Sequence, residues 1–164
     1  MNEAQTKILK FMSEMTARTD MNEFARKLGL TQGQILQDMQ ELAKEGFLKK
    51  IGSGYAVTDK GKMALRVVAP VAEELKFEFY TSTGNPTGLS ARSIKEFHDV
   101  ALDVDSVSLE FHLYRGDFEN WFRTTMVDLA FADELAIIRK TDLRGEELKK
   151  AIAKATSLKY SLAV

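Results

Sequence analysis

The feature that most constrains the fold is a change of hydrophobic period at Gly46. Before this glycine, Ile35, Met39 and Leu42 recur every three or four positions between Gln32 and Glu45, which predicts one inward stripe of a helix. After it, segments 47–51 and 55–57 have the pattern of two short strands on either side of the flexible turn 52–54. The sequence therefore predicts a β-hairpin directly behind a helix.

Two shorter helices are predicted ahead of this one. Apolar residues in 4–15 follow helical spacing, and Asp20 is a good N-cap for a second helix over 21–28. Gly29 ends the second helix because glycine adopts positive φ freely. Thr31 then caps the helix that leads to the hairpin.

A closing helix follows the hairpin. The segment 58–61 caps a helix that begins at Lys62, and Pro70 ends it near Ala69 because proline removes a helical hydrogen bond. Three helices, a hairpin and a closing helix in this order define a winged helix-turn-helix. We expect residues 1–69 to form this module and residues 75–164 to form a second domain.

A resemblance to a known family is found between Phe24 and Leu65, in the stretch FARKLGLTQGQILQDMQELAKEGFLKKIGSGYAVTDKGKMAL. It has Leu-Gly-Leu before the turn, a helix that ends in Leu-x3-Gly-Phe-Leu, and Gly-Tyr-x-Val-Thr-x-Lys-Gly after the hairpin. In these elements it resembles the MarR-like and archaeal-type winged-helix regulators. The resemblance implies a module that binds duplex DNA.

If the module binds DNA in the usual way, the helix from Gln32 to Glu45 lies in the major groove. Glutamine pairs bidentately with adenine, and a carboxylate accepts a hydrogen bond from the cytosine amino group. We expect the exposed residues of this helix to be Gln32, Gln34, Gln37, Asp38 and Glu41. The predicted base contacts are the first four of these. The predicted phosphate contacts, which carry no sequence information, are Arg26, Lys27, Lys49, Lys50, Lys60 and Lys62.

A second interpretation stays open because the recognition helix is not basic. DNA-binding relatives commonly carry Arg or Lys where this chain has Gln37 and Asp38, and Glu41 adds another carboxylate one turn later. Winged helices with such surfaces also serve as protein-interaction modules. The alternative is therefore an adaptor whose winged helix binds a partner protein. The chain up to Arg66 is mildly basic and the remainder is acidic, which favours DNA binding only weakly.

The second half reads as mostly helical with one or two strands. Segment 75–82 alternates like a strand with Phe77 and Phe79 on one face, and residues 84–88 form a turn. We expect the tail from Ser157 to be an extended arm or an edge strand. Predicted helices cover 91–102 with Ser90 as cap, 117–126 with Asp117 as cap, 133–140 and 146–155. The expected fold class is α+β, mostly helical.

This half resembles an uncharacterised family of small prokaryotic domains. Their pattern is an aromatic-His pair, then Asp-Phe-x-x-Trp, then a helix with Asp and Leu-Ala spacing. The corresponding residues here are Phe111-His112, the run 117–122, Asp128 and Leu135-Ala136. The resemblance implies no activity.

Candidate chemistry in the second half is limited to two histidines. His112 and Asp117 could form an acid–base pair, but no nucleophile, metal cluster or phosphate loop accompanies them. We therefore expect a buried His112 that bonds Asp117 or a backbone group. His98 is expected on a solvated helix face. We predict no catalytic residue, no metal ligand and no cofactor. A solvent-open cleft that contains both His112 and Asp117 would favour an enzyme.

The expected partners are duplex DNA and a second copy of the chain. A homodimer doubles the base pairs that a single winged helix reads. The C-terminal domain is a possible binding surface for an effector or a protein partner. No apolar run reaches the length of a membrane span, and the first residues lack a secretory signal, so we expect a cytoplasmic protein that binds no membrane.

Overall fold

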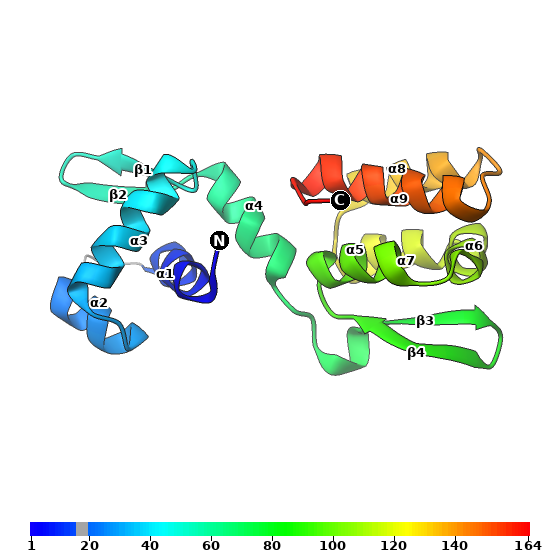
Figure 1. Ribbon diagram of the computed structural model, residues 1–164, viewed down its shortest axis with the longest axis horizontal. Helices are drawn as coiled ribbons and strands as arrows, with labels where there is room; N and C mark the ends of the chain where they lie inside the picture. Colours follow the sequence, from blue (N-terminus) through cyan, green and yellow to red (C-terminus); the bar gives the residue numbers. More distant parts are fainter. Residues whose placement is uncertain (16–19) are drawn as a thin grey trace. The chain divides into compact units, whose positions relative to one another are not determined.

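The computed structural model describes residues 1–15 and 20–164. The chain divides into two compact units, Met1–Arg66 and Val67–Val164, and each is described by itself. Across the described residues the structure is α+β and 63% helical, with nine α-helices and two small antiparallel sheets (Figure 1). The predicted class, α+β and mostly helical, is confirmed. Within the described ranges, no helix is both long and apolar enough to cross a membrane.

Three helices open the first unit, and local capping sets their ends. Helix α1 (Glu3–Glu14) begins with a full capping box, in which the side chains of Asn2 and Gln5 each accept the other's backbone N–H. Helix α2 (Met21–Leu28) is capped by Asp20 and ends at Gly29, whose φ of 66° lies in the left-handed region. Helix α3 (Gln32–Lys44) is capped by Thr31.

A hairpin and a fourth helix follow α3, as expected. Strand β1 (Leu48–Ile51) pairs antiparallel with β2 (Gly54–Val57), with Lys50 opposite Tyr55. Helix α4 (Asp59–Val68) begins three residues ahead of the predicted Lys62. The Thr58 hydroxyl accepts the Gly61 N–H at 3.1 Å and donates to the Gly46 carbonyl at 2.6 Å. This hydroxyl therefore joins the start of α4 to the end of α3.

The core of the first unit lies where the inner faces of α1, α2 and α3 meet the start of β1. Phe11 and Phe24 pack edge to face with ring centroids 4.7 Å apart, which fixes α2 against α1. The buried apolar residues are Ile8, Leu9, Phe24, Ile35, Met39, Leu42 and Leu48. The predicted inward stripe of α3, Ile35, Met39 and Leu42, is confirmed.

The second unit has three layers (Figure 1). A hairpin of β3 (Phe77–Ser82) and β4 (Asn85–Ala91) lies on α5 (Ile94–Asp103), α6 (Ser106–Arg115) and α7 (Asp117–Thr124). Helices α8 (Leu129–Arg139) and α9 (Gly145–Tyr160) cover the other side of this middle layer. A short 3-10 helix, Glu73–Leu75, leads into β3.

Strand β4 is the main correction to the sequence interpretation. Residues 84–88 were expected to be a turn and Ser90 a helix cap. Only Gly84 lies in the turn, residues 85–91 form β4, and Ser93 caps α5. Strand β4 contains Pro86 and Gly88, which suit an edge strand with an irregular register. The Thr87 hydroxyl donates to the Phe79 carbonyl at 2.8 Å and helps to hold this irregular pairing.

Helix boundaries in the second unit also differ from expectation. Asp117 does not cap α7; Gly116 holds the N-cap position and Asp117 is the first helical residue. Helix α8 starts at Leu129, ahead of the predicted residue 133. The tail is not a strand, because α9 continues to Tyr160 and residues 162–164 have no regular structure.

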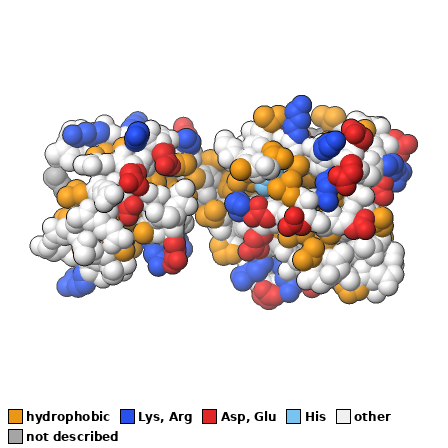
Figure 2. Space-filling view, in the orientation of Figure 1, with side chains coloured by type: hydrophobic (Ala, Val, Ile, Leu, Met, Phe, Trp, Pro, Cys, Tyr) orange, Lys and Arg blue, Asp and Glu red, His pale blue; other side chains and the backbone are white. Residues whose placement is uncertain are grey.

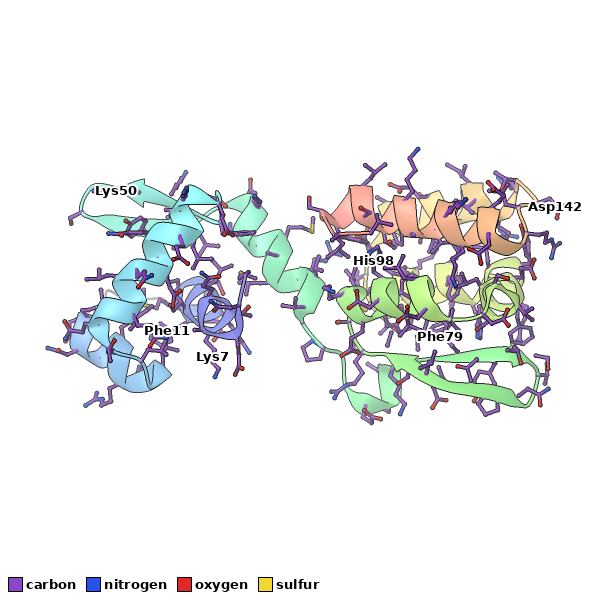
Figure 3. The ribbon with its side chains drawn as sticks, viewed as in Figure 1. Lys7, Phe11, Lys50, Phe79, His98 and Asp142 are labelled. Atoms are coloured by element: carbon purple, nitrogen blue, oxygen red, sulfur yellow. The ribbon has the colours of Figure 1, made fainter. Side chains whose placement is uncertain are left out.

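Aromatic rings connect the three layers of the second unit. Phe97 of α5 lies at the centre, with its ring centroid 6.0 Å from that of Phe79 and 5.0 Å from those of Phe118 and Phe122. The Phe122 ring continues to Phe131 of α8 at 4.6 Å. Figure 3 shows Phe79 between the hairpin and the middle helices. The aromatic residues around Phe97 are thus shared core.

Gly61 offers a sharp test of packing in the first unit. A Cβ at this position would lie 2.4 Å from the Phe47 carbonyl oxygen and 2.8 Å from Val57 Cγ1. We expect Gly61→Ala to lower the free energy of unfolding by about 1–3 kcal/mol through overpacking. Gly33→Ala is the matched control, because its Cβ meets nothing within 4 Å. It should raise stability by about 0.5–1 kcal/mol. Urea unfolding followed by circular dichroism measures both, and equal stabilities would contradict this packing.

Candidate functional site

The outer face of α3 in the first unit is polar and rich in glutamine. Thr31 caps the helix, so its first turn is well defined, and Gln32, Gln34 and Gln37 are all exposed. The predicted exposure of these three glutamines is confirmed. Gln40 extends the same polar surface, and Leu36 lies exposed among the glutamines. Gln32 also donates to the side chain of Asn22 in α2.

Asp38 is not on this surface, so its predicted exposure is wrong. Only 7% of the residue is exposed, and its carboxylate accepts a hydrogen bond from Gln5 Nε2 at 3.3 Å. The same Gln5 nitrogen donates to Glu41 Oε2 at 2.8 Å. Both carboxylates of α3 therefore bond Gln5 of α1, but only Asp38 is buried. Glu41 is exposed, and its Oε1 also accepts a hydrogen bond from Gln37 Nε2 at 3.4 Å. We withdraw Asp38 from the base contacts.

Gln5 is the residue that sequence reasoning missed in this unit. Only 5% of it is exposed, and its side chain bonds both carboxylates of α3 while its Oε1 accepts the Asn2 N–H. Its position one turn before Ile8 on the apolar face of α1 was the available signal. A polar residue on a buried face needs a partner, and Asp38 supplies one.

Some of the predicted phosphate contacts already interact with other residues of the protein, and others do not. Lys27 pairs with Glu23 at 3.2 Å. Lys60 donates to the Glu45 carbonyl at 2.6 Å and lies 4.7 Å from the centre of the Phe47 ring, so it caps the end of α3. Arg26, Lys49, Lys50 and Lys62 are exposed, and no ion pair to another residue of the described ranges is seen for them.

The hairpin that follows α3 carries two exposed lysines. Lys49 and Lys50 are neighbours in β1, so their side chains leave opposite faces of the strand. Figure 3 labels Lys50 on the hairpin, and Figure 2 shows basic side chains over this part of the unit. Strand β1 also packs against α3. The hairpin that carries these lysines therefore packs against the same helix that carries the glutamines.

The second unit contains a cavity of about 470 Å³. It lies between β3 and the junction where α6 ends and α7 begins. Its lining combines aromatic, neutral polar and charged side chains of both signs: Lys76, Phe77, Glu78, Tyr80, Thr83, Gly84, Phe111, His112, Arg115, Asp117, Asn120, Trp121 and Thr125. His112 and Asp117 thus share one cavity, the condition that the sequence analysis attached to an enzyme.

His112 itself is held at both ring nitrogens. It is 4% exposed, its Nε2 accepts the backbone N–H of Tyr80 at 2.8 Å, and its Nδ1 lies 2.9 Å from Asp117 Oδ2. A nitrogen that accepts an N–H is unprotonated, so the proton resides on Nδ1 and is donated to Asp117. The predicted buried histidine bonded to Asp117 is confirmed. Neither nitrogen is free to exchange a proton with a bound molecule in this geometry.

Burial lowers the pKa of His112 below its ordinary value of 6.5. The hydrogen bond to Asp117 and the charge of that carboxylate oppose this effect, and the nearby Arg115 adds to it. The imidazole is therefore neutral near pH 7 and acts as a fixed link between β3 and α7.

Asp117 connects this histidine to Arg115. Its Oδ2 lies 3.5 Å from Arg115 Nε, and the Arg115 guanidinium carbon lies 4.6 Å above the Phe111 ring. Arg115 was not predicted from the sequence to be a site residue, unlike Asp117. The cation–π spacing of Phe111 and Arg115, four residues apart on one helix face, was the available signal.

His98 is not on a solvated face, so that prediction is wrong. It is fully buried, and its two ring nitrogens bond Thr156 of α9 and, at 2.6 Å, the Ala163 carbonyl (Figure 3). His98 therefore attaches the C-terminal segment to α5 and does not face the cavity around His112.

Within residues 1–15 and 20–164, no three His, Asp or Glu side chains gather in a way that could hold a metal ion. No protein-family model, curated protein or solved structure matches the chain.

The lowered pKa of His112 predicts a specific loss of stability in acid. Between 6.5 and the lower folded pKa, the unfolded chain takes up the proton first, so the free energy of unfolding falls as pH falls through this window. Urea unfolding at pH 7.5 and 5.5 should show a smaller fall for His112→Gln than for the wild type.

Direct titration of the wild-type imidazole by NMR provides the check that needs no variant. We expect the His112 pKa to lie below 6.5. A value at or above 6.5 would show that burial does not dominate at this site.

Proposed function

We propose that residues 1–69 form a winged helix-turn-helix that binds duplex DNA, and that the protein is a transcriptional regulator whose C-terminal domain serves as an effector or pairing domain. The observation that carries the proposal is the glutamine-rich outer face of α3 together with the exposed Lys49 and Lys50 of the hairpin that packs against this helix. Helix α3 would be the recognition helix, and the β1–β2 hairpin would be the wing.

The composition of the α3 surface supports base recognition in the major groove. Gln34 and Gln37 are exposed amides, and a glutamine amide pairs with the N6 and N7 edge of adenine. Leu36, which is 46% exposed between them, suits contact with a thymine methyl group. Together these side chains favour a site that contains A·T pairs.

The hydrogen bonds of Gln5 reduce an objection to this proposal. Carboxylates on a recognition helix repel phosphates, but Asp38 is buried and Glu41 is turned to Gln5. Their charge remains, so the net attraction to DNA depends on the exposed cations at Arg26, Lys49, Lys50 and Lys62. We therefore expect modest affinity from one copy, which a homodimer with two such helices would increase.

The wing lysines give the first test. Fragments selected from genomic DNA at low salt should be retained by the full chain, with affinity that falls as salt rises. In Lys49→Glu/Lys50→Glu the salt slope should drop by about one unit for each lost phosphate contact, on all sequences alike. Lys150→Glu/Lys154→Glu in α9 makes the same charge change outside the wing and should bind like the wild type. If the wild type retains no fragment at low salt, the proposal fails.

Gln37 gives the test of sequence readout. On a selected fragment, Gln37→Ala should weaken binding by about 1–3 kcal/mol and relax the preference at one base pair, while binding to unrelated DNA stays unchanged. Gln40→Ala, one turn further from the first turn of α3, is the control and should have a smaller effect. An equal loss on all sequences would mean that Gln37 reads no base.

The exposed Leu36 and Ile51 favour a second candidate. They are 46% and 57% exposed on α3 and the hairpin, and apolar side chains on these two elements also suit a protein partner. In that case the module is an adaptor. Leu36→Ser would then abolish partner capture by the full chain, while Lys49→Glu/Lys50→Glu would leave it intact.

A further inference from the structure

The cavity of the second unit has the construction of a small-molecule site. At about 470 Å³ it is in the size range of ligand pockets, and it combines aromatic walls with a few polar groups. All its lining residues lie between Lys76 and Thr125, so the site belongs to the second unit alone. Ligand binding at this site does not depend on DNA binding by the first unit.

Arg115 is a charged group of this cavity whose side chain is held in position by its neighbours. Its guanidinium rests on the Phe111 ring at 4.6 Å, and its Nε faces Asp117 Oδ2 at 3.5 Å. Asp117 is in turn fixed by the buried His112 at 2.9 Å. Support of this kind holds a binding side chain in one orientation before a ligand arrives.

The outer nitrogens of Arg115 are available for a ligand. The contact to Asp117 uses Nε, and no hydrogen bond from either Nη to another described residue is seen. Lys76, the other cation of the cavity, is already engaged with Glu73 and Glu78. The guanidinium of Arg115 therefore offers two parallel donors, which match the two oxygens of a carboxylate.

The other charges restrict the ligand to a single negative charge. Glu78 and Asp117 are also in the lining, and their negative charges disfavour a dianion such as a phosphate monoester. A neutral ligand would leave the Arg115 donors without a charged acceptor. A monocarboxylate satisfies both conditions.

Aromatic rings and neutral donors define the rest of the ligand. Phe77, Tyr80 and Trp121 present ring surface to the cavity, while Asn120 and Thr125 supply neutral polar groups. Trp121 is held in place because its Nε1 donates to the Leu75 carbonyl at 2.8 Å. Such walls favour a compact apolar body over a long polar chain.

We propose that this cavity binds a small monocarboxylic acid with an apolar body. The carboxylate accepts two hydrogen bonds from the Arg115 guanidinium, and the body lies against Phe77, Tyr80 and Trp121. His112 and Asp117 are positioning residues that orient Arg115. This role accounts for a buried histidine–aspartate pair in which neither histidine nitrogen is free for proton transfer.

Binding of chosen probes to the full chain tests the proposal. Trp121 is the only tryptophan and lines the cavity, so its fluorescence reports occupancy. We expect phenylacetate to bind and phenylacetamide, the uncharged analogue, to bind at least about tenfold more weakly because the charge-assisted hydrogen bonds are lost. Phosphate should not bind. L-Phenylalanine tests whether an amino acid is the source of the carboxylate: tighter binding than phenylacetate assigns the site to amino acids, and weaker binding assigns it to simple acids.

Variants connect the signal to Arg115. Arg115→Gln should weaken phenylacetate binding at least about tenfold, and Arg115→Lys should restore only part of it, because lysine lacks the planar pair of donors. Arg123→Gln is the matched control, since Arg123 is a similarly exposed arginine that pairs with Asp133 and lies outside the lining. It should bind like the wild type.

Asp117→Asn tests the positioning role. It keeps the volume of the side chain and removes the charge that orients Arg115. We expect the loss of this orientation to outweigh the removed repulsion of the ligand, so that phenylacetate binds more weakly with unchanged selectivity for acid over amide. An NMR spectrum of each variant establishes that it is folded. If folded wild-type protein binds neither carboxylate, or binds phenylacetamide as tightly as phenylacetate, the proposal is overturned.

Discussion

The aromatic contacts around Phe97 are the interaction on which the second unit depends. A two-stranded hairpin is marginal by itself in water, so β3 and β4 need a surface to pack on. Phe77 and Phe79 supply the hairpin side of that surface and Phe97 and Phe118 the helix side. From Phe122 the contacts continue to α8 and α9. One continuous apolar core therefore positions the hairpin, the middle helices and the cavity together.

The polar groups at the edge of this core explain how a cavity with fixed geometry arises. His112 is surrounded by aromatic rings, with Phe77 at 4.8 Å and Phe118 at 5.6 Å, and it uses both ring nitrogens for hydrogen bonds. A buried polar group that lacks a partner is costly, so the two bonds specify where β3 and α7 lie relative to α6. The bond from His112 also holds Asp117 in place, and Asp117 in turn orients Arg115, which lines the cavity.

In the first unit, too, a buried polar side chain fixes the positions of charged groups. Gln5 is buried in α1 and bonds the carboxylates of Asp38 and Glu41. Asp38 is thereby kept off the outer face of α3, where exposed glutamine amides predominate. A surface that reads bases needs hydrogen-bonding groups with weak repulsion toward phosphate. The proposed regulator thus combines a glutamine-rich reading face with separate cations on its hairpin. A carboxylic acid bound in the second unit would give such a regulator a chemical input.

Local signals in the sequence determined most of the first unit. The caps at Asp20 and Thr31, the glycine at 29 and the change of period at Gly46 act within a few residues, so α2, α3 and the hairpin could be predicted from them. Longer-range contacts decided the rest. Strand β4 has poor strand-forming residues and exists because β3 pairs with it. Asp38 and His98 were predicted to be surface residues from the local sequence. Both are buried because they bond residues distant in the sequence, Gln5 and Thr156. Periodicity identifies which face of a helix is apolar, but the partner of a buried polar group depends on which elements the fold brings together.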